Sequence, residues 1–193
     1  MSHGVNAVPS NPLVLVVTGP ESTGKTTLAL LLASRLAAPL VPEEARAYID
    51  QHRADYSPGD LLAIAHHQQR AEAEAYRSAR LQGSQHLVAD TDLQVIYVWW
   101  QEKYGAAPQT LGRAYARQSE RLYLLCYPDL PWQPDPQREH PHDRLRLFRL
   151  YERDLISRQA RYVTIRGAGD ERLEAALDAI DNPAQSAEQP PET

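Results

Sequence analysis

The feature that most restricts the fold of this chain is an apolar run followed closely by a glycine-rich turn. Leu13 to Val17 is entirely aliphatic, and Gly19-Pro-Glu-Ser-Thr-Gly-Lys-Thr-Thr27 begins one residue after it. The turn fits the spacing G-x-x-x-x-G-K-[ST], which binds phosphates between a strand and a helix. The apolar run predicts that strand, and residues 26–37 have the periodicity of a helix that ends before Pro39. The combination predicts an α/β fold of the P-loop NTPase type.

The residue types of this loop suit a nucleoside triphosphate. Gly19 and Gly24 would let backbone amides surround an anion, to which the helix N-terminus adds positive potential. We expect Lys25 to bridge the β- and γ-phosphates and the Thr26 hydroxyl to bind Mg²⁺. The other loop positions expected to contact the nucleotide are Glu21, Ser22, Thr23 and Thr27. The motif therefore predicts ATP and Mg²⁺ as cofactors, but it does not specify the reaction.

Short apolar runs alternate with longer helical patterns along the rest of the chain. Further strands are predicted at residues 40–41, 86–89, 121–126 and 162–165, and helices at 43–51, 58–81, 93–104 and 170–180. Such alternation predicts a five-stranded parallel sheet with helices on both faces, as in nucleoside and nucleotide kinases, with ligands at the carboxyl ends of its strands. We expect one domain over residues 13–181, an extension at 1–12 and a disordered polar tail at 182–193.

Composition narrows the class of protein. The net charge is −5, which is unfavourable for general nucleic-acid or anionic-membrane binding. Cys126 is the only cysteine, so an intrachain disulfide is excluded. No apolar run approaches the roughly 20 residues of a membrane helix, and the N-terminus lacks the pattern of a signal peptide. These features predict a cytoplasmic protein that acts on a small molecule.

Carboxylates follow two of the predicted strands. Asp90 ends the strand at 86–89, where a Walker B carboxylate would hold Mg²⁺; its alternative role is helix capping. Asp92 is either a helix cap or a ligand of a substrate hydroxyl. Glu43 follows the strand at 40–41 and would face the γ-phosphate from the acceptor side, where it could accept a proton from an attacking hydroxyl. Glu44 is the alternate for that role; the other interpretation is that the two glutamates are only a solvated pair in the first helical turn, which the helix dipole favours.

Arginines are the other candidate ligands. Arg46 would contact the acceptor or lie free on the surface. The proline-rich segment from Asp129 predicts a mobile lid over residues 129–145, in which Arg138 would neutralise charge on the transferred group. Its alternative is a solvated side chain. Trp132 in the same segment is a candidate substrate contact or a packing residue.

Other aromatic and histidine clusters are less specific. Trp99 and Trp100 lie in an amphipathic pattern that favours core packing over ligand stacking. The histidine pairs at 66–67 and at 140 and 142 lack a set of partner ligands, so we predict no metal site beyond Mg²⁺.

Taken in order, these motifs resemble the NadR-like P-loop ATPase family, and most closely its ribosylnicotinamide kinase domains. The resemblance runs from about residue 13 to 180 and rests on these segments: Gly19 to Thr27, Pro42-Glu-Glu-Ala-Arg46, Gln68, Asp90-Thr-Asp92, Glu102-Lys-Tyr104, and Pro131-Trp-Gln-Pro-Asp135 with Arg138. The Walker loop is common to many families, whereas the combination of the other segments is far more specific.

The resemblance implies ATP-dependent phosphorylation of the 5′-hydroxyl of nicotinamide riboside, with Lys25 and Thr26 at ATP and Mg²⁺, Asp90 near the metal, and Glu43 and Asp92 near the ribose. Full-length NadR carries a DNA-binding module and an adenylyltransferase domain before the kinase, and we expect neither in the short segment before Leu13. In NadR-type kinases aromatic residues stack on the nicotinamide ring. This chain has Pro42 and Arg70 at or near the corresponding positions.

Two other functions fit the same motifs. One is a kinase with this architecture that takes another nucleoside or a deoxynucleoside as its acceptor. Alternatively, the protein would be a nucleotide-dependent switch that hydrolyses ATP slowly and binds a partner. The acceptor side of the site discriminates between them, because only a kinase needs a closed pocket with a carboxylate beside the γ-phosphate. The sequence leaves the oligomeric state open.

Overall fold

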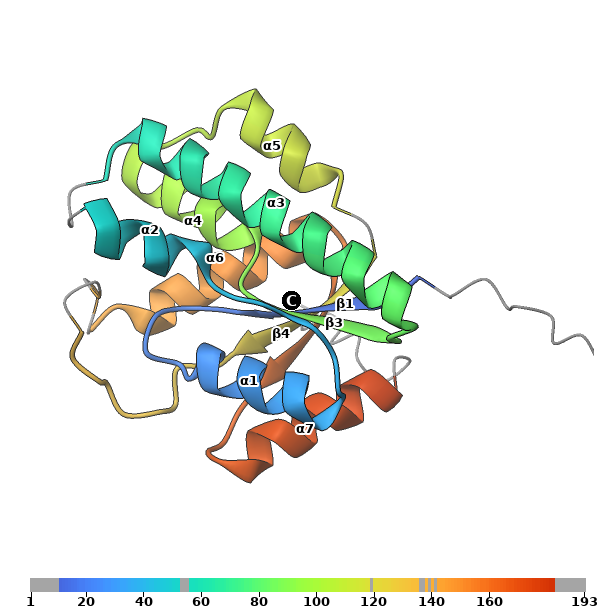
Figure 1. Ribbon diagram of the computed structural model, residues 1–193. Helices are drawn as coiled ribbons and strands as arrows, with labels where there is room; N and C mark the ends of the chain where they lie inside the picture. Colours follow the sequence, from blue (N-terminus) through green and yellow to red (C-terminus); the bar gives the residue numbers. More distant parts are fainter. Residues whose placement is uncertain are drawn as a thin grey trace, which may run out of the picture.

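The computed structural model describes residues 11–52, 56–118, 120–135, 138, 140 and 142–182, and it forms one α/β unit with a central sheet (Figure 1). The strands are parallel and lie in the order β2-β3-β1-β4-β5. Their bounds are β1 (Leu13–Thr18), β2 (Leu40–Val41), β3 (His86–Asp90), β4 (Arg121–Cys126) and β5 (Arg161–Ile165). The helices are α1 (Lys25–Arg35), α2 (Glu44–His52), α3 (Pro58–Gln82), α4 (Leu93–Tyr104), α5 (Gln109–Ala116), α6 (Arg144–Ser157) and α7 (Asp170–Asp181).

Alternating side chains of the strands bury both faces of the sheet. In β1, Val14 and Val16 belong to the core between the sheet and helices α3, α4 and α6. Leu15 and Val17 belong to the core between the sheet and helices α1 and α7. Side chains of a parallel strand point alternately to the two faces, so a continuous aliphatic run is what a doubly covered sheet requires. Figure 1 shows α1 and α7 together below the sheet and the other helices above it.

A third apolar cluster joins the helices above the sheet to one another. It is formed by α2, α3, α4 and α5, with Leu61, Trp100 and Tyr115 among its buried members. This cluster fixes α4 against the long helix α3. Trp100 is only 8% exposed, which confirms core packing for this one of the two adjacent tryptophans.

The predicted fold class is confirmed, with the predicted strands and helices present and their ends shifted by one or two residues. Helices α5 and α6 were not among those given bounds from the sequence. Helix α5 is short, contains Gly112 and follows Pro108, so its periodicity over eight residues is weak. The N-terminal extension and the tail fall mostly outside the described residues, as do Pro136, Gln137, Glu139 and Pro141 of the proposed lid. Among the described helices, none combines the length and the apolar character needed to cross a bilayer.

Candidate active site

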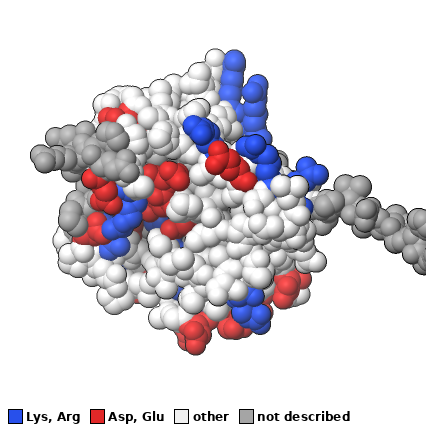
Figure 2. Space-filling view, in the orientation of Figure 1, with Lys and Arg blue, Asp and Glu red and all other residues white. Residues whose placement is uncertain are grey.

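A cavity of about 580 Å³ opens at the carboxyl ends of the central strands. Its lining comes from the loop between β1 and α1, from the start of α2, from α4 and α6, and from the segment after β4. Charged side chains of both signs gather on the left of the molecule in Figure 2, beside this end of the sheet. The cavity thus has an anion-binding floor on one side and a mixed wall of carboxylates, arginines and aromatic rings on the other.

The two glycines of the loop are required by its shape. Gly19 has φ 125°, and a Cβ there would lie 2.9 Å from the carbonyl oxygen of Cys126 at the end of β4. Gly24 has φ 75°, and a Cβ there would lie 2.9 Å from the side chain of Leu130. A side chain at either position would be strained and would push the loop off the neighbouring backbone. Gly24 also caps α1 without a side chain, so the first N–H groups of the helix face the cavity.

Inside the loop, the carbonyl oxygen of Pro20 organises two of the predicted ligands. It accepts hydrogen bonds from the Thr23 hydroxyl and from Lys25 Nζ, each 2.8 Å long. Glu21, Ser22, Thr23, Lys25, Thr26 and Thr27 all line the cavity, as predicted for nucleotide contacts. The lysine therefore lies over the loop whose backbone would surround the phosphates.

Arg172 holds this loop from behind, and sequence reasoning missed it. It is 4% exposed and donates to the carbonyl oxygens of Thr23, Tyr127 and Gly167 and to the carboxylate of Asp129. Two other segments, the one after β4 and the turn before α7, are therefore joined to the P-loop through one guanidinium. A signal was present in the sequence, because a basic residue in the first turn of α7 is disfavoured by the helix dipole and needs specific partners.

We expect Arg172→Ala to lower the free energy of unfolding by about 3 kcal/mol, since it leaves a partly buried carboxylate and several carbonyls without their donor. Chemical denaturation measures this difference. The matched control is Arg153→Ala, which removes an exposed arginine that donates to the carbonyl of Arg149 one turn earlier. That control should change stability by about 0.5 kcal/mol or less. Equal effects of the two substitutions would contradict the bracing role of Arg172.

Asp90 and Thr26 meet where a magnesium ion is predicted. Asp90 is 3% exposed and hydrogen-bonds to Thr26, while its Oδ1 is buried without a hydrogen-bond partner. A buried, unpaired carboxylate oxygen beside a threonine hydroxyl suits a hard cation that takes the rest of its ligands from phosphates and water. The described residues contain no cluster of three or more acidic, histidine or cysteine side chains that could hold a metal ion. Burial raises the pKa of Asp90, and Thr26, Lys25 and Arg46 oppose that shift.

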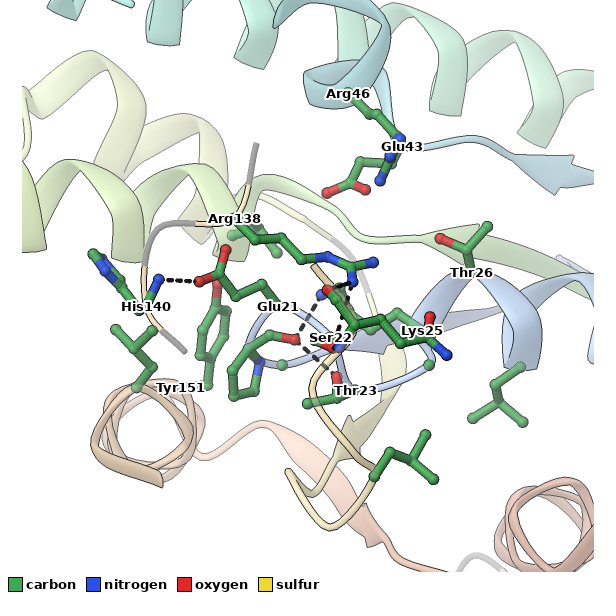
Figure 3. A pocket seen from close by; sticks show the side chains of 18 of the residues that line it. Glu21, Ser22, Thr23, Lys25, Thr26, Glu43, Arg46, Arg138, His140 and Tyr151 are labelled. Atoms are coloured by element: carbon green, nitrogen blue, oxygen red, sulfur yellow. Dashed lines mark hydrogen bonds between the residues drawn. The ribbon is translucent and has the colours of Figure 1, made fainter. Parts of the chain in front are cut away.

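Glu43 projects from the end of β2 into the same cavity (Figure 3). Burial raises its pKa, and the neighbouring Asp90 carboxylate adds to the increase. Lys25, Arg46 and Arg138 act in the opposite direction by stabilising the negative charge. Glu43 is thus a carboxylate of increased basicity that lies near the positive charges of Lys25, Arg46 and Arg138.

The backbone around Glu43 is fixed by Gln68, which α3 contributes. The side-chain oxygen of Gln68 accepts from the amide of Glu44 at 3.1 Å, and its Nε2 donates to the carbonyl of Thr91 at 3.2 Å. Gln68 is 2% exposed, so both bonds are shielded from water. This one amide side chain therefore sets the start of α2 relative to the end of β3, and with it the spacing between Glu43 and Asp90.

Contacts from the segment after β4 close over the P-loop (Figure 3). Ser22 Oγ accepts from the amide of Gln133 at 2.8 Å and from Arg138, while Arg144 donates to the Ser22 carbonyl at 3.0 Å. The Glu21 carboxylate accepts from the backbone amide of His140. Arg46 is paired with Asp135 in this segment rather than free on the surface. Arg46 and Arg138 both line the cavity, as the predicted binding roles require.

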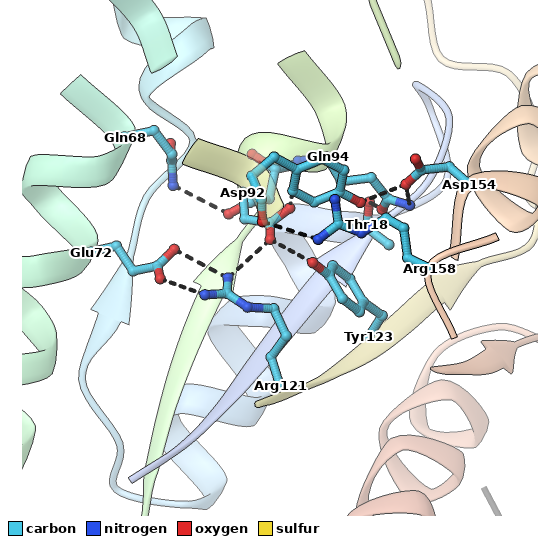
Figure 4. A network of polar contacts seen from close by, with 11 residues as sticks. Thr18, Gln68, Glu72, Asp92, Gln94, Arg121, Tyr123, Asp154 and Arg158 are labelled. Atoms are coloured by element: carbon cyan, nitrogen blue, oxygen red, sulfur yellow. Dashed lines mark hydrogen bonds and ion pairs between the residues drawn. The ribbon is translucent and has the colours of Figure 1, made fainter. Parts of the chain in front are cut away.

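Three of the residues predicted to bind substrate, Asp92, Glu44 and Trp132, lie outside the lining of the cavity, and Asp92 takes the role of helix cap that was its alternative. Asp92 is 1% exposed; it accepts from the amide of Gln94 at 2.9 Å, from Arg121 at 2.9 Å and from the Tyr123 hydroxyl at 3.0 Å (Figure 4). It is therefore the cap of α4 and part of a buried ion pair. Glu44 contributes a backbone amide to Gln68, and the ring of Trp132 lies 5.8 Å from the Arg144 guanidinium.

Aromatic side chains are what sequence reasoning left out of the site. Trp99 of α4, Tyr151 of α6 and Tyr56 line the cavity, although the tandem tryptophans were both expected in the core. The helical positions of Trp99 and Trp100 differ by about 100°, so the two rings point to different sides of α4. A position inside an amphipathic pattern does not reveal which flank of the apolar face borders a cavity.

Comparisons with known proteins agree with this architecture. A family model described as AAA domain matches residues 14–172. Two structures of NadR are similar: the complex with NR has a TM-score of 0.71 and 21% identity over 96% of this chain, and the complex with NAD and AMP-PNP has a TM-score of 0.68 and 22% identity over 95%. Thymidylate kinase from Ehrlichia chaffeensis has a TM-score of 0.63 and 12% identity, covering 90% of this chain and 99% of its own.

A sequence relative comes from another class of enzyme. The tRNA dimethylallyltransferase of Acaryochloris marina (strain MBIC 11017) is 27% identical over 163 residues, which make up 73% of this chain and 53% of that protein. The chain likewise spans 52% of the NadR chains. At sequence identities this low, the similarity to the solved structures establishes the fold and nothing further. With the family model covering most of the chain, the chain belongs to the AAA domain family, and its fold is similar to that of the NadR structures.

Proposed function

We propose that this protein is an ATP-dependent kinase that phosphorylates the 5′-hydroxyl of a ribonucleoside, with nicotinamide riboside as the acceptor and nicotinamide mononucleotide as the product. The observation that carries the proposal is the position of Glu43, a carboxylate with a raised pKa in the same cavity as Lys25 and Arg138. A switch that only hydrolyses ATP does not need a carboxylate placed to receive the proton of an acceptor hydroxyl.

In the proposed reaction, the 5′-oxygen of the acceptor forms a bond to the γ-phosphorus of ATP. The bond from that phosphorus to the β–γ bridging oxygen breaks, and ADP leaves. Glu43 receives the proton of the hydroxyl. Lys25 and Arg138 would stabilise the charge of the transferred group, and the backbone amides of the P-loop would hold the remaining phosphates.

Thr26 and Asp90 are the residues that would hold magnesium, which supplies charge neutralisation at the phosphate oxygens when bound. The remaining contribution of the protein is positioning and exclusion of water. Glu21, Ser22 and Arg138 support both, because they connect the P-loop with the segment after β4.

The choice of a nucleoside acceptor rests on the chemistry of the pocket and on the NadR-like sequence motifs. Trp99 of α4 and Tyr151 of α6 line the cavity, and so do the carboxylates Glu21 and Glu43. Nicotinamide riboside has a planar, positively charged ring and ribose hydroxyls, which match these two kinds of group. The net charge of −5 is unfavourable for a tRNA acceptor like that named for the transferase relative.

The raised pKa of Glu43 gives the proposed reaction a defined pH dependence. A general base must be deprotonated, so kcat/KM should fall as the pH decreases through the raised pKa of this carboxyl. Asp90 also has a raised pKa, and Glu43→Gln separates the two. In that variant, the residual rate should no longer show the decrease at low pH that comes from protonation of Glu43. If the decrease kept the same midpoint pH in the variant, another group would cause it.

The proposed function is tested by incubating the purified protein with ATP and Mg²⁺ and a panel of nucleosides, with products identified by mass spectrometry. The panel contains nicotinamide riboside, adenosine, uridine, thymidine and deoxyadenosine. We expect nicotinamide mononucleotide to form fastest. A faster reaction with another nucleoside would keep the kinase and change its acceptor, and ATP consumption without any nucleoside phosphate would favour the switch.

A further inference from the structure

Thr91, which lies between the two carboxylates at the end of β3, has a strained backbone. Its φ is 70°, in the left-handed region, where a β-branched residue is a genuine outlier. The residue is also buried, at 3% exposure. Strain of this kind persists only where the surrounding structure over-determines it, and it is concentrated at functional sites. The contacts that hold Thr91 therefore also set how the chain leaves β3 at Asp90.

The backbone of Thr91 is held by two hydrogen bonds of different kinds. Its amide donates to the carbonyl oxygen of Val17 at 3.0 Å, which continues the pairing between β3 and β1. Its carbonyl oxygen accepts from Nε2 of Gln68 at 3.2 Å. The first bond comes from the sheet itself, whereas the second depends on one side chain of α3.

The other half of the same side chain fixes the residue after Glu43. Helix α2 begins at Glu44, and the N–H groups of a first helical turn have no partner within their own helix. The side-chain oxygen of Gln68 accepts from this N–H at 3.1 Å. The position thus needs one acceptor and one donor at once, which an amide side chain supplies. Gln68 is 2% exposed, so water has little access to replace either bond.

The two ends of this bridge carry the two carboxylates of the proposed chemistry. Glu43 lines the cavity, and Oδ1 of Asp90 is buried without a hydrogen-bond partner among the described residues. The strands before them, β2 and β3, are neighbours in the sheet, but β2 has only two residues, Leu40 and Val41. So short a ladder fixes the following segment weakly. Gln68 supplies a connection beyond its end.

The helix that carries Gln68 is itself firmly placed. One turn later on α3, Glu72 accepts from Arg121 at 2.9 Å, and Arg121 donates to Asp92 at 2.9 Å (Figure 4). Helix α3 therefore holds the segment after β3 twice, directly at Thr91 and through an arginine at Asp92. A side chain on such a support can keep two backbone segments at a constant separation.

We propose that Gln68 is a positioning residue for phosphoryl transfer. By binding the amide of Glu44 and the carbonyl of Thr91, it fixes the separation between the proposed base Glu43 and the proposed magnesium ligand Asp90. Gln68 does not belong to the cavity lining, so it acts through these two residues and not on a ligand. The part that concerns the base rests on the proposed function, whereas the part that concerns Asp90 is independent of any acceptor.

The first test measures nucleotide binding without turnover. Gln68→Met keeps the approximate length of the side chain and removes both polar groups. Calorimetry on the intact protein gives the dissociation constant of a non-hydrolysable ATP analogue, once with Mg²⁺ and once with EDTA in its place. We expect the variant to bind the analogue about 10-fold more weakly with Mg²⁺, because outer partners of metal ligands affect metal affinity by this order. Without Mg²⁺ the affinity should stay close to that of the wild type.

The second test is a double-mutant cycle with Glu43→Gln, measured as phosphorylation of nicotinamide riboside at saturating Mg²⁺. Gln68→Met alone should lower kcat by about 10- to 100-fold, because small misplacements of reacting groups have effects of this size. In the Glu43→Gln background the same substitution should lower kcat by less than about 3-fold, since the base that it positions is already absent. A loss of packing alone would lower kcat by the same factor in both backgrounds.

The adjacent residue offers a matched control. Gln69 is exposed on α3 and lies outside the cavity lining, so Gln69→Met should leave both measurements unchanged. Thermal melting shows whether each variant folds. If Gln68→Met does not fold, Gln68→Asn takes its place, because its side chain is one methylene too short to span both bonds, and the same pattern is expected with smaller factors.

The outcomes separate this inference from the proposed function. If the wild-type protein phosphorylates a nucleoside, the inference needs both the loss of Mg²⁺-dependent affinity and the smaller effect in the Glu43→Gln background. Absence of either result overturns it and leaves the kinase standing. If the wild type phosphorylates no nucleoside, the proposed function fails and calorimetry decides. A loss of affinity confined to Mg²⁺ then supports the link from Gln68 to Asp90, and an unchanged affinity overturns it.

Discussion

Lys25→Ala is expected to lower kcat/KM for ATP by about 10²- to 10³-fold. Lys25 carries the only ammonium group within the P-loop, where the β- and γ-phosphates would lie, and its partner in the structure is the carbonyl of Pro20. Loss of a preorganised positive group at a developing charge typically costs this much in rate. Steady-state kinetics measures the change, and circular dichroism checks that the variant is folded.

The effect of Lys25→Ala should exceed that of removing a positive charge elsewhere. Arg153→Ala is the comparison, because Arg153 is exposed on α6 and lies outside the cavity lining. We expect that variant to keep the activity of the wild-type protein. If Lys25→Ala bound ATP and turned it over as the wild type does, the P-loop would not be the nucleotide site.

Glu43→Gln is expected to keep ATP binding and to lower phosphoryl transfer by about 10²-fold or more. The amide has nearly the same shape as the carboxyl group but cannot receive the proton of the acceptor hydroxyl. Nucleotide affinity by calorimetry and transfer by rapid quench distinguish binding from chemistry. The reduction should therefore appear in kcat rather than in the affinity for ATP.

Glu44→Gln is the matched control for this prediction. Glu44 is the next residue, and its side chain lies outside the cavity lining, while its backbone amide binds Gln68. We expect near-normal transfer, since the substitution leaves that amide in place. A loss of transfer in Glu44→Gln together with normal transfer in Glu43→Gln would move the base to Glu44 and contradict the geometry of the site.

The sequence predicted the fold and the phosphate side of the site because those signals are local. The P-loop is one continuous segment, and its flanking strand and helix follow from residues within about ten positions. The parallel sheet could be predicted from aliphatic runs such as Leu13 to Val17, because a strand that is covered on both faces needs apolar side chains at every position. The strand order, however, depends on pairing between distant segments, and the short helix α5 has too little periodicity to be recognised.

The acceptor side was harder to predict because its residues meet only in three dimensions. Trp99 and Tyr151 are 52 positions apart in the sequence and come together through the packing of α4 and α6. Asp92 illustrates the opposite error: a carboxylate at a strand end looks available for substrate, but Arg121 and Tyr123 of β4 engage it. Arg121 in turn binds Glu72 of α3, so the pair belongs to the scaffold.

The central claim, that this cavity transfers the γ-phosphoryl group of ATP to a nucleoside, is tested most directly with ATP labelled in that group. The labelled nucleotide is mixed with excess protein, Mg²⁺ and nicotinamide riboside for a single turnover, and the label is followed into each product. The account predicts that the label appears in the 5′-phosphate of nicotinamide mononucleotide, and that Glu43→Gln slows this step. Label found only in inorganic phosphate, at a rate independent of every nucleoside supplied, would contradict it.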